Sequence, residues 1–345
     1  MKRTALAALL TAALPLLAQT TPRDASGSIG RIERFDPALD ALIPPDAQME
    51  KLAEGFDWSE GPVWRRRERD LLFSDVPQNV VYRWQEGAGL SEYQRPSGFT
   101  GGSRDGESGS NGLTVDRRGN LILAQHGDRR VARLEADRSF TTLADRWDGK
   151  RFNSPNDLAL VRQTCLWGLC TTGYDLFFTD PPYGLEKGME DPLKELPFQG
   201  VYRLTRRGEL RLQLRDLSRP NGVTVSPDRK TVYVAISDPA MPLVMAYSIS
   251  RSGDLTDGRI FFDTRPLMPG RKGLPDGLKT DRAGNVWTTG PGGVLVISPQ
   301  GRLLGLLNTG EATANCAWGD DGSTLYITAD MYLCRIRTTA RGILP

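Results

Sequence analysis

The sequence of 345 residues is poor in the residue types that usually bind zinc. It contains one histidine, His126, and four cysteines, and no cysteine pair lies near the histidine at zinc-finger spacing. A zinc site of the usual histidine and cysteine type is therefore not expected. The chain also lacks an excess of charge, because 44 basic and 42 acidic residues leave a net charge of +2. This balance excludes the broad basic surface of a nucleic-acid-binding protein, and an aromatic content of 8% gives no ladder for stacking bases.

The clearest hydrophobic run, at residues 4–18, is too short to cross a membrane. It follows Lys2 and Arg3, an arrangement that is typical of a secretory signal peptide. We expect residues 1–18 to be removed and residues 19–44 to form an N-terminal lead-in. The mature protein should then be periplasmic or secreted, with no membrane attachment after cleavage. An uncleaved N-terminal anchor is the alternative.

The four cysteines fit an exported protein but do not require disulfides. Cys165 and Cys170 flank four residues of a predicted hairpin. The sequence is consistent with a disulfide between them and equally with two free thiols. Cys316 and Cys334 lie in predicted strands near the C-terminus. We expect these two thiols to be free and buried.

The sequence does contain a five-residue pattern that occurs six times, and each copy begins with a polar, mostly metal-capable residue. The copies are Glu60-Gly61-Pro62-Val63-Trp64, Asn111-Gly112-Leu113-Thr114-Val115, Asn156-Asp157-Leu158-Ala159-Leu160, Asn221-Gly222-Val223-Thr224-Val225, Asp276-Gly277-Leu278-Lys279-Thr280 and Asn315-Cys316-Ala317-Trp318-Gly319. Their first residues, which we call head residues, stand at positions 60, 111, 156, 221, 276 and 315 and are 51, 45, 65, 55 and 39 residues apart. A repeated sequence unit predicts a repeated element of the fold.

These intervals fit the four-stranded blades of a β-propeller, which take about 40–50 residues each. They are too long for leucine-rich or ankyrin repeats. Short alternating strands bounded by Gly, Asp and Asn occur throughout, and no long helical pattern interrupts them. We therefore predict an all-β protein with one six-bladed β-propeller over residues 45–345, although the length alone would suggest two domains. If the copies are equivalent, their head residues meet in the central channel.

Four head residues form a candidate metal site in this channel. Glu60, Asn156, Asn221 and Asp276 all offer oxygen, and a mixed set of carboxylates and amides suits a hard cation, above all Ca²⁺. Replacement by Mg²⁺, Mn²⁺ or Zn²⁺ stays open. The alternative for any one of these residues alone is a local role in a turn.

Further segments accompany the repeats in a fixed order. They are Phe56-Asp57-Trp58-Ser59-Glu60-Gly61-Pro62, Gln125-His126-Gly127-Asp128, Asn153-Ser154-Pro155-Asn156-Asp157, Phe178-Thr179-Asp180-Pro181-Pro182-Tyr183-Gly184, Arg219-Pro220-Asn221-Gly222, Pro275-Asp276-Gly277 and Thr313-Ala314-Asn315-Cys316. With these segments the sequence resembles the senescence marker protein/gluconolactonase/luciferin-regenerating enzyme family of calcium-dependent six-bladed propellers, in particular its bacterial gluconolactonases. The resemblance covers almost the whole mature chain.

The resemblance implies a Ca²⁺ ion in the central channel, held by Glu60, Asn156, Asn221 and Asp276. It also implies hydrolysis of sugar lactones such as D-glucono-1,5-lactone, in which the cation polarises the carbonyl group and Asp276 acts as general acid/base. The expected partner is thus a small-molecule lactone, and nothing suggests more than a monomer or a weak dimer. The natural lactone stays open, because the export signal separates this chain from many cytoplasmic relatives.

Two further residues gain a role from the resemblance. Bacterial members carry a similar histidine by the pocket, which implies a catalytic role for His126, and a buried structural histidine is the alternative. Animal relatives carry a substrate-binding arginine two residues before an asparagine, which matches Arg151 and Asn153. The residues that follow depart from the animal pattern, so a solvated loop position for Arg151 stays open as well.

The remaining candidates are expected around the substrate. We expect Asn111, Asn153 and Tyr183 to line the pocket, and Asn315 either to do the same or to support a metal ligand. Local turn structure is the alternative for each of them. Two other functions also stay open. They are hydrolysis of phosphotriesters or aryl esters on the same scaffold, and binding of a sugar or a protein without catalysis.

Overall fold

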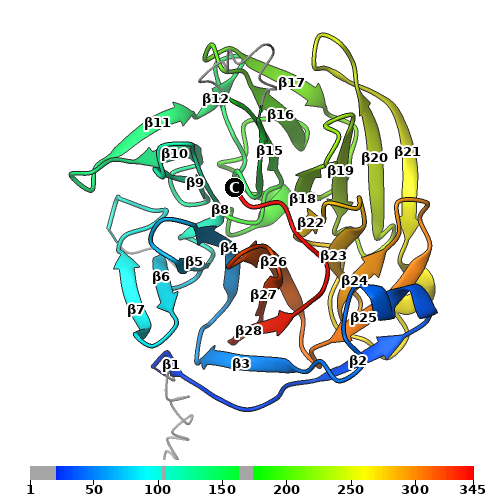
Figure 1. The fold of residues 1–345 in the computed structure, drawn as a ribbon. Helices are drawn as coiled ribbons and strands as arrows, with labels where there is room; N and C mark the ends of the chain where they lie inside the picture. Colours follow the sequence, from blue (N-terminus) through cyan, green and yellow to red (C-terminus); the bar gives the residue numbers. More distant parts are fainter. Residues whose placement is uncertain (1–20, 103–105, 163–173) are drawn as a thin grey trace, which may run out of the picture.

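The computed structural model describes residues 21–102, 106–162 and 174–345 and shows an almost entirely β-stranded protein. In this part of the chain, six sheets of four or five antiparallel strands stand around a central channel (Figure 1), which confirms the predicted six-bladed β-propeller. The predicted signal peptide, Cys165 and Cys170 lie outside the described residues. Within the described ranges, no helix has the length and hydrophobicity needed to cross a membrane.

Blades 1 to 4 are each built from four consecutive large strands, with the first strand beside the channel and the fourth outermost (Figure 1). Blade 1 contains β4 (Ser59–Arg65), β5 (Asp70–Asp75), β6 (Val80–Gln85) and β7 (Gly89–Gln94). Blade 2 contains β8 (Ser110–Val115), β9 (Leu121–Gln125), β10 (Arg130–Leu134) and β11 (Phe140–Ala144). Blade 3 contains β14 (Leu158–Arg162), β15 (Tyr174–Asp180), β16 (Gly200–Leu204) and β17 (Leu210–Leu214). Blade 4 contains β18 (Pro220–Val225), β19 (Thr231–Ile236), β20 (Leu243–Ile249) and β21 (Leu255–Asp263).

Blades 5 and 6 recruit strands from the N-terminal part of the chain. Blade 5 contains β22 (Leu278–Thr280), β23 (Val286–Gly290), β24 (Gly293–Ile297), β25 (Leu303–Asn308) and, at its outer edge, β2 (Arg31–Arg34). Blade 6 contains β26 (Thr313–Gly319), β27 (Thr324–Ala329), β28 (Tyr332–Arg337), β3 (Met49–Glu54) and β1 (Arg23–Asp24). Because β3 completes the blade that the C-terminal strands begin, both ends of the chain close the ring. Short elements between the blades are β12 (Arg146–Trp147), β13 (Lys150–Arg151) and the 3₁₀ helices η1 (Pro37–Ala41), η2 (Gly188–Glu190) and η3 (Arg265–Leu267).

The head residues lie where the innermost strands begin. In β4, β8, β18 and β26 the pairing register shifts at or beside the head residue. A β-bulge of this kind redirects a side chain out of the regular alternation of the strand. In blades 3 and 5, Asn156 and Asp276 instead stand two residues before the first strand. The sequence repeat thus marks the point at which each blade departs from regular pairing and turns a polar group toward the channel.

Glycine at the second position of the repeat allows neighbouring blades to approach each other. A Cβ atom on Gly61 would lie 2.1 Å from the carbonyl oxygen of Asn111, the head residue of the next blade. A Cβ atom on Gly277 would lie 1.9 Å from Cγ of Asn315. Both distances are far below van der Waals contact, so the glycines bring successive head residues together around the ring.

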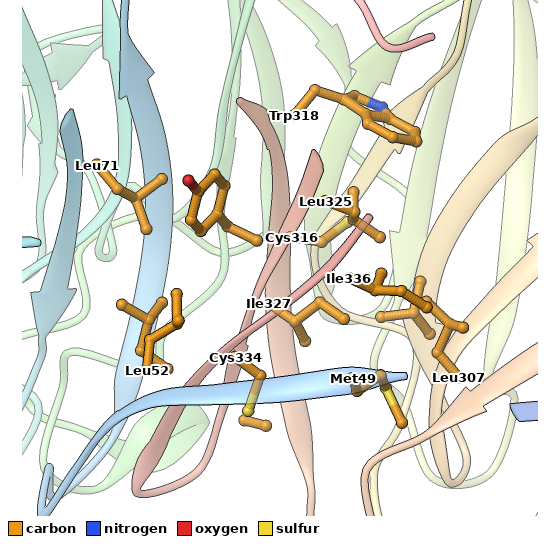
Figure 2. Close-up of a cluster of buried hydrophobic side chains, with 14 of the residues drawn as sticks. Met49, Leu52, Leu71, Leu307, Cys316, Trp318, Leu325, Ile327, Cys334 and Ile336 are labelled. Atoms are coloured by element: carbon orange, nitrogen blue, oxygen red, sulfur yellow. The ribbon is translucent and has the colours of Figure 1, made fainter. Parts of the chain in front are cut away.

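Apolar side chains pack between adjacent blades, and the largest cluster joins blades 5, 6 and 1 (Figure 2). In it the Trp64 and Tyr326 rings stack with centroids 5.5 Å apart, and Trp287 meets Trp318 edge-on at 5.0 Å. Cys316 and Cys334 are fully buried in the same cluster as free cysteines, which confirms the sequence prediction. Burial raises the pKa of both thiols to about 12, so they behave as small apolar groups.

Candidate active site at one mouth of the channel

A cavity of about 390 Å³ lies at the end of the channel where the inner strands begin. We call it the polar mouth. It is lined by Trp58, Glu107, Asn111, Asn156, Tyr183, Arg219, Asn221, Ser237, Gly273, Leu274 and Asp276. The sequence predicts five of these as metal or substrate contacts, namely Asn111, Asn156, Tyr183, Asn221 and Asp276. Glu60 does not line the cavity. It is only 1% exposed, yet it lies close enough to Asp276 for the two carboxylates to repel each other.

Three buried amide oxygens at the polar mouth have no hydrogen-bond partner. They are the Oδ1 atoms of Asn111, Asn156 and Asn221, and these side chains are 4%, 2% and 4% exposed. A buried polar atom without a partner costs free energy and calls for an explanation. Three such oxygens beside two carboxylates form a set of donors that suits a hard cation.

The orientation of Asn156 is set by a residue behind it. Its Nδ2 lies 3.4 Å from Nε2 of His126, and Nδ1 of the same ring lies 3.2 Å from Oε2 of Glu107. A ring proton on Nδ1, on the side of the Glu107 carboxylate, leaves Nε2 able to accept a hydrogen bond from the Asn156 amide. The amide oxygen is then turned away from the ring. His126 is fully buried and does not line the cavity.

Asn221 is oriented in the same way by a different group. Its Nδ2 donates to Oγ of Ser237 at 2.8 Å, and Ser237 Oγ donates in turn to the carbonyl oxygen of Pro275 at 2.5 Å. Pro275 directly precedes Asp276, so this chain of hydrogen bonds also connects blade 4 to the head residue of blade 5. In both asparagines the amino group is held from behind and the oxygen stays free.

The two carboxylates of the site have strongly shifted acidities. Burial, followed by the neighbouring Asp157 carboxylate, raises the pKa of Glu60 to about 8. Burial also raises the pKa of Asp276 well above its ordinary value, with further contributions from the carboxylates of Glu60 and Asp157. The Lys279 ammonium group lowers both pKa values, but by less. This concentration of buried negative charge favours any cation that can reach it.

Comparison with known proteins agrees with this arrangement. Residues 58–330, which form most of the chain, match the family model described as SMP-30/Gluconolactonase/LRE-like region. The chain belongs to this family. The match confirms the resemblance seen in the sequence segments.

Individual members of the family are similar over nearly their whole length. A gluconolactonase from Zymomonas mobilis is 38% identical over 341 residues, which cover 96% of this chain and 93% of the relative. The solved structure of a gluconolactonase from Xanthomonas campestris has a TM-score of 0.78 and 30% identity, covering 92% of this chain and 98% of that one. A calcium-binding regucalcin from Agrobacterium tumefaciens has a TM-score of 0.64 at 17% identity, covering 84% and 92% of the two chains, and shows the shared fold.

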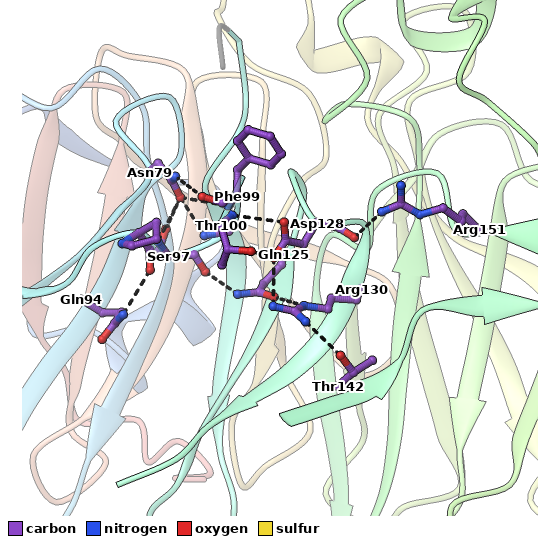
Figure 3. Close-up of polar contacts among 12 residues, drawn as sticks. Asn79, Gln94, Ser97, Phe99, Thr100, Gln125, Asp128, Arg130, Thr142 and Arg151 are labelled. Carbon is purple, nitrogen blue, oxygen red and sulfur yellow. Dashed lines mark hydrogen bonds and ion pairs between the residues drawn. The ribbon is translucent and has the colours of Figure 1, made fainter. Parts of the chain in front are cut away.

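In this family member, Arg151 and Asn153 are engaged away from the polar mouth. The Arg151 guanidinium donates to the carbonyl oxygen of Asp128 at 2.7 Å (Figure 3). Asn153 is fully buried, and its Nδ2 donates to the carbonyl oxygens of Asp180 at 2.8 Å and Phe198 at 3.0 Å. The structure therefore does not bring these two predicted substrate residues to the cavity.

Asn315 is also absent from the lining. Its Nδ2 donates to Oε2 of Glu60 at 3.0 Å, and the side chain is 1% exposed. Of the two roles that the sequence leaves open for Asn315, this contact corresponds to support of a ligand.

Sequence reasoning missed Trp58, Glu107, Arg219 and Ser237 as lining residues. Trp58 and Arg219 each stand two residues before a head residue, so their closeness to the repeat offered a signal for them. Glu107 and Ser237 had no such signal. Glu107 comes from the long connection between β7 and β8, and Ser237 directly follows the second strand of blade 4.

The connection that carries Glu107 is anchored by Asn79. Its Oδ1 accepts hydrogen bonds from the backbone N–H groups of Ser97, Gly98 and Phe99 at 2.9, 2.7 and 3.2 Å (Figure 3). Gln125 donates to the Ser97 carbonyl at 2.8 Å from the neighbouring blade. This network fixes the start of the connection against blades 1 and 2, on the side of the channel where Glu107 meets His126.

Proposed function

We propose that the protein is a Ca²⁺-dependent lactonase that opens sugar lactones such as D-glucono-1,5-lactone. The lactonase class rests on its gluconolactonase relatives. The observation that carries the proposal is the convergence at the polar mouth of three amide oxygens that have no hydrogen-bond partner among the described residues, the buried Glu60 carboxylate and the half-buried Asp276 carboxylate. This arrangement supports a catalytic cation at the channel mouth rather than a buried structural ion.

The oxygen donors of the residues present suit a hard cation, and among hard cations they favour Ca²⁺. Glu60, Asn156, Asn221 and Asp276 would hold the ion, and Asn111 offers one more free oxygen. Ca²⁺ takes six to eight oxygen ligands in flexible geometry, whereas Mg²⁺ demands near-ideal octahedral geometry. Among the described residues, no group of three or more His, Cys, Asp or Glu side chains is arranged to hold a metal ion, and the proposed set differs in relying on amides. When bound, Ca²⁺ would act as a Lewis acid toward the lactone carbonyl oxygen.

The residues of the chain would then bind the lactone and move one proton. Asp276 would accept a proton from the attacking water as the new bond forms between the water oxygen and the carbonyl carbon. The same carboxyl would return that proton to the ring oxygen as the ring carbon–oxygen bond breaks, which leaves a hydroxy acid. Burial and the neighbouring carboxylates raise the pKa of Asp276 in the metal-free site, and a bound cation would lower it, so that the carboxylate is ionised and able to accept this proton.

The lining also suits a ligand that carries several hydroxyl groups. Arg219 and Tyr183 offer donors, whereas Glu107 and Asn111 offer acceptors, around one cavity. Trp58 and Leu274 provide apolar surface for the carbon skeleton. Burial, with the nearby Asp276 carboxylate, raises the pKa of Tyr183 above its ordinary value, so its hydroxyl stays protonated and available as a donor.

The direct test is hydrolysis of D-glucono-1,5-lactone by the mature protein, followed with a pH indicator. We expect turnover that is lost with EDTA and restored by added Ca²⁺. Parallel restoration with Mg²⁺, Mn²⁺ and Zn²⁺ measures metal preference. A protein that binds Ca²⁺ but opens no lactone would contradict the proposed substrate class and favour another ester.

A further inference from the structure

One charged side chain interrupts an otherwise uncharged ring below the polar mouth. The fourth residues of the six repeat copies are Val63, Thr114, Ala159, Thr224, Lys279 and Trp318. All six line a second cavity of about 290 Å³ farther along the inner strands, which we call the apolar mouth. Lys279 is the sole ionised group among these six positions, and it does not line the polar mouth.

The Lys279 ammonium group is held against Asn315. Its Nζ donates to Oδ1 of Asn315 at 3.2 Å and to the carbonyl oxygen of Leu278 at 3.1 Å. Asn315 Oδ1 accepts a second hydrogen bond from the backbone N–H of Cys316 at 2.9 Å. Two donors therefore converge on one amide oxygen.

These contacts allow only one orientation of the Asn315 amide. With Oδ1 facing Lys279 and the Cys316 N–H, Nδ2 faces Glu60 and donates to Oε2 at 3.0 Å. A flipped amide would direct its NH₂ group at an ammonium group and an N–H, and its oxygen at a carboxylate. All three contacts would then be repulsive, and the buried amide would have no alternative partner in these contacts.

We infer that Lys279 is a positioning residue that acts through Asn315 on Glu60. The ammonium group fixes the amide, and the amide engages one oxygen of the Glu60 carboxylate so that the carboxylate keeps a single orientation in the channel. The inference rests on the proposed function, because its consequence is tighter binding of Ca²⁺ by Glu60. Outer contacts of this kind commonly change metal affinity by about 10- to 100-fold.

The inference predicts an effect opposite in sign to simple electrostatics. Lys279 is close enough to lower the pKa values of both Glu60 and Asp276. As a bare positive charge it would repel a cation, so its removal would tighten Ca²⁺ binding. As a positioning residue it aids binding, so its removal weakens Ca²⁺ binding. A single affinity measurement separates the two.

The test compares Lys279→Met with the wild type by calorimetric titration with Ca²⁺. We expect Kd to rise by about 10-fold. The matched control is Lys230→Met, which removes one positive charge from the exposed turn between β18 and β19 and should leave Kd unchanged. Thermal unfolding of each metal-free variant separates loss of affinity from loss of fold.

A double-mutant cycle keeps the test decisive if Lys279→Met is also less stable. Asn315→Leu should weaken Ca²⁺ binding to a similar extent, and adding Lys279→Met to it should cause no further weakening, since the two residues act in series. Additive losses, or tighter or unchanged binding by Lys279→Met, would overturn the inference and leave the proposed site intact. Absence of Ca²⁺ binding by the wild type would overturn the proposed metal and this inference together.

Discussion

The two mouths of the channel are built from the same six strands, yet they differ in chemistry. The polar mouth contains side-chain amide oxygens, such as those of Asn156 and Asn221, that have no hydrogen-bond partner among the described residues. The apolar mouth is lined largely by aliphatic side chains, among them Leu113 and Val223, and residues 343–345 of the C-terminal segment lie over it. One repeat thus supplies both a reactive surface and a packed one.

The difference between the two mouths follows from the three-residue offset between the first and the fourth position of each repeat copy. The first residue of each copy lies at or before the irregular start of the inner strand, whereas the fourth residue lies about 10 Å farther along. At the irregular end, bulges and glycine contacts bring polar side chains together. At the regular end, side chains pack against the neighbouring blade. A propeller can therefore change its chemistry at the head residues while the rest of the strand keeps the ring stable.

The largest expected effect is at the polar mouth, in Asp276→Asn. Loss of the proton acceptor should lower kcat by at least about 100-fold while the fold stays intact. The measurement is steady-state lactone hydrolysis at saturating Ca²⁺, with circular dichroism as the check on folding. Asp46→Asn, at an exposed position, is the matched control. Full turnover by Asp276→Asn would remove this carboxylate from the mechanism.

Removal of Ca²⁺ should lower the stability of the protein through the polar mouth. Without the ion, Lys279 is, among the described residues, the one cation that lowers the pKa values of both Glu60 and Asp276, and the free amide oxygens lose their bound cation, so the free energy of unfolding should fall. At a Ca²⁺ concentration 100 times Kd, the expected loss is about 2.7 kcal/mol. Thermal melts with and without EDTA measure it. An identical Tm in both would mean that no ion binds to the native state.

In contrast to Asp276→Asn, a substitution at the apolar mouth should lower the stability of the fold and leave kcat unchanged. Leu113→Ala removes a side chain that is 5% exposed and packs between blades 1 and 2. We expect a loss of about 2 kcal/mol in the free energy of unfolding, measured by denaturant titration. The kcat of the folded fraction should stay close to wild type. Leu193→Ala, at a position that is 61% exposed, is the control. A large loss of kcat in Leu113→Ala, but not in this control, would show that the two mouths are coupled.

The smallest expected effect concerns Asp75, which accepts hydrogen bonds from the backbone N–H groups of Asp57 and Trp58 at the edge of the polar mouth. Burial raises the pKa of Asp75 to about 7 from an ordinary value of 3.8. Because the folded-state pKa is the higher one, the stabilising contribution is complete below about pH 4 and is lost as the pH rises through 7.

Asp75→Asn should therefore flatten the pH dependence of stability in this range. Denaturant titrations at several pH values between about 4 and 8 would measure the change. An unchanged slope would show that Asp75 stays ionised in the folded protein throughout.

The sequence predicts the propeller fold and several lining residues of the polar mouth, because both depend on a short pattern that is repeated along the chain. The head residues Asn111, Asn156, Asn221 and Asp276 all line the cavity. Reasoning from short motifs did not place Arg151 or Asn153, whose partners come from segments that are distant in sequence. Glu107 escaped notice for the same reason, since its contact with His126 joins residues that lie 19 positions apart in the sequence.

The sequence by itself determined the number of blades, the oxygen-rich character of the channel entrance and the two buried free thiols, because repeat spacing, residue type and strand pattern are properties of short segments. Only the tertiary structure decided how each amide is oriented. That choice depends on His126 behind Asn156, on Ser237 behind Asn221 and on Lys279 behind Asn315. These three residues lie 30, 16 and 36 positions away from the amides they orient, and strand pairing within blade 4 or contact between neighbouring blades brings them within hydrogen-bond distance.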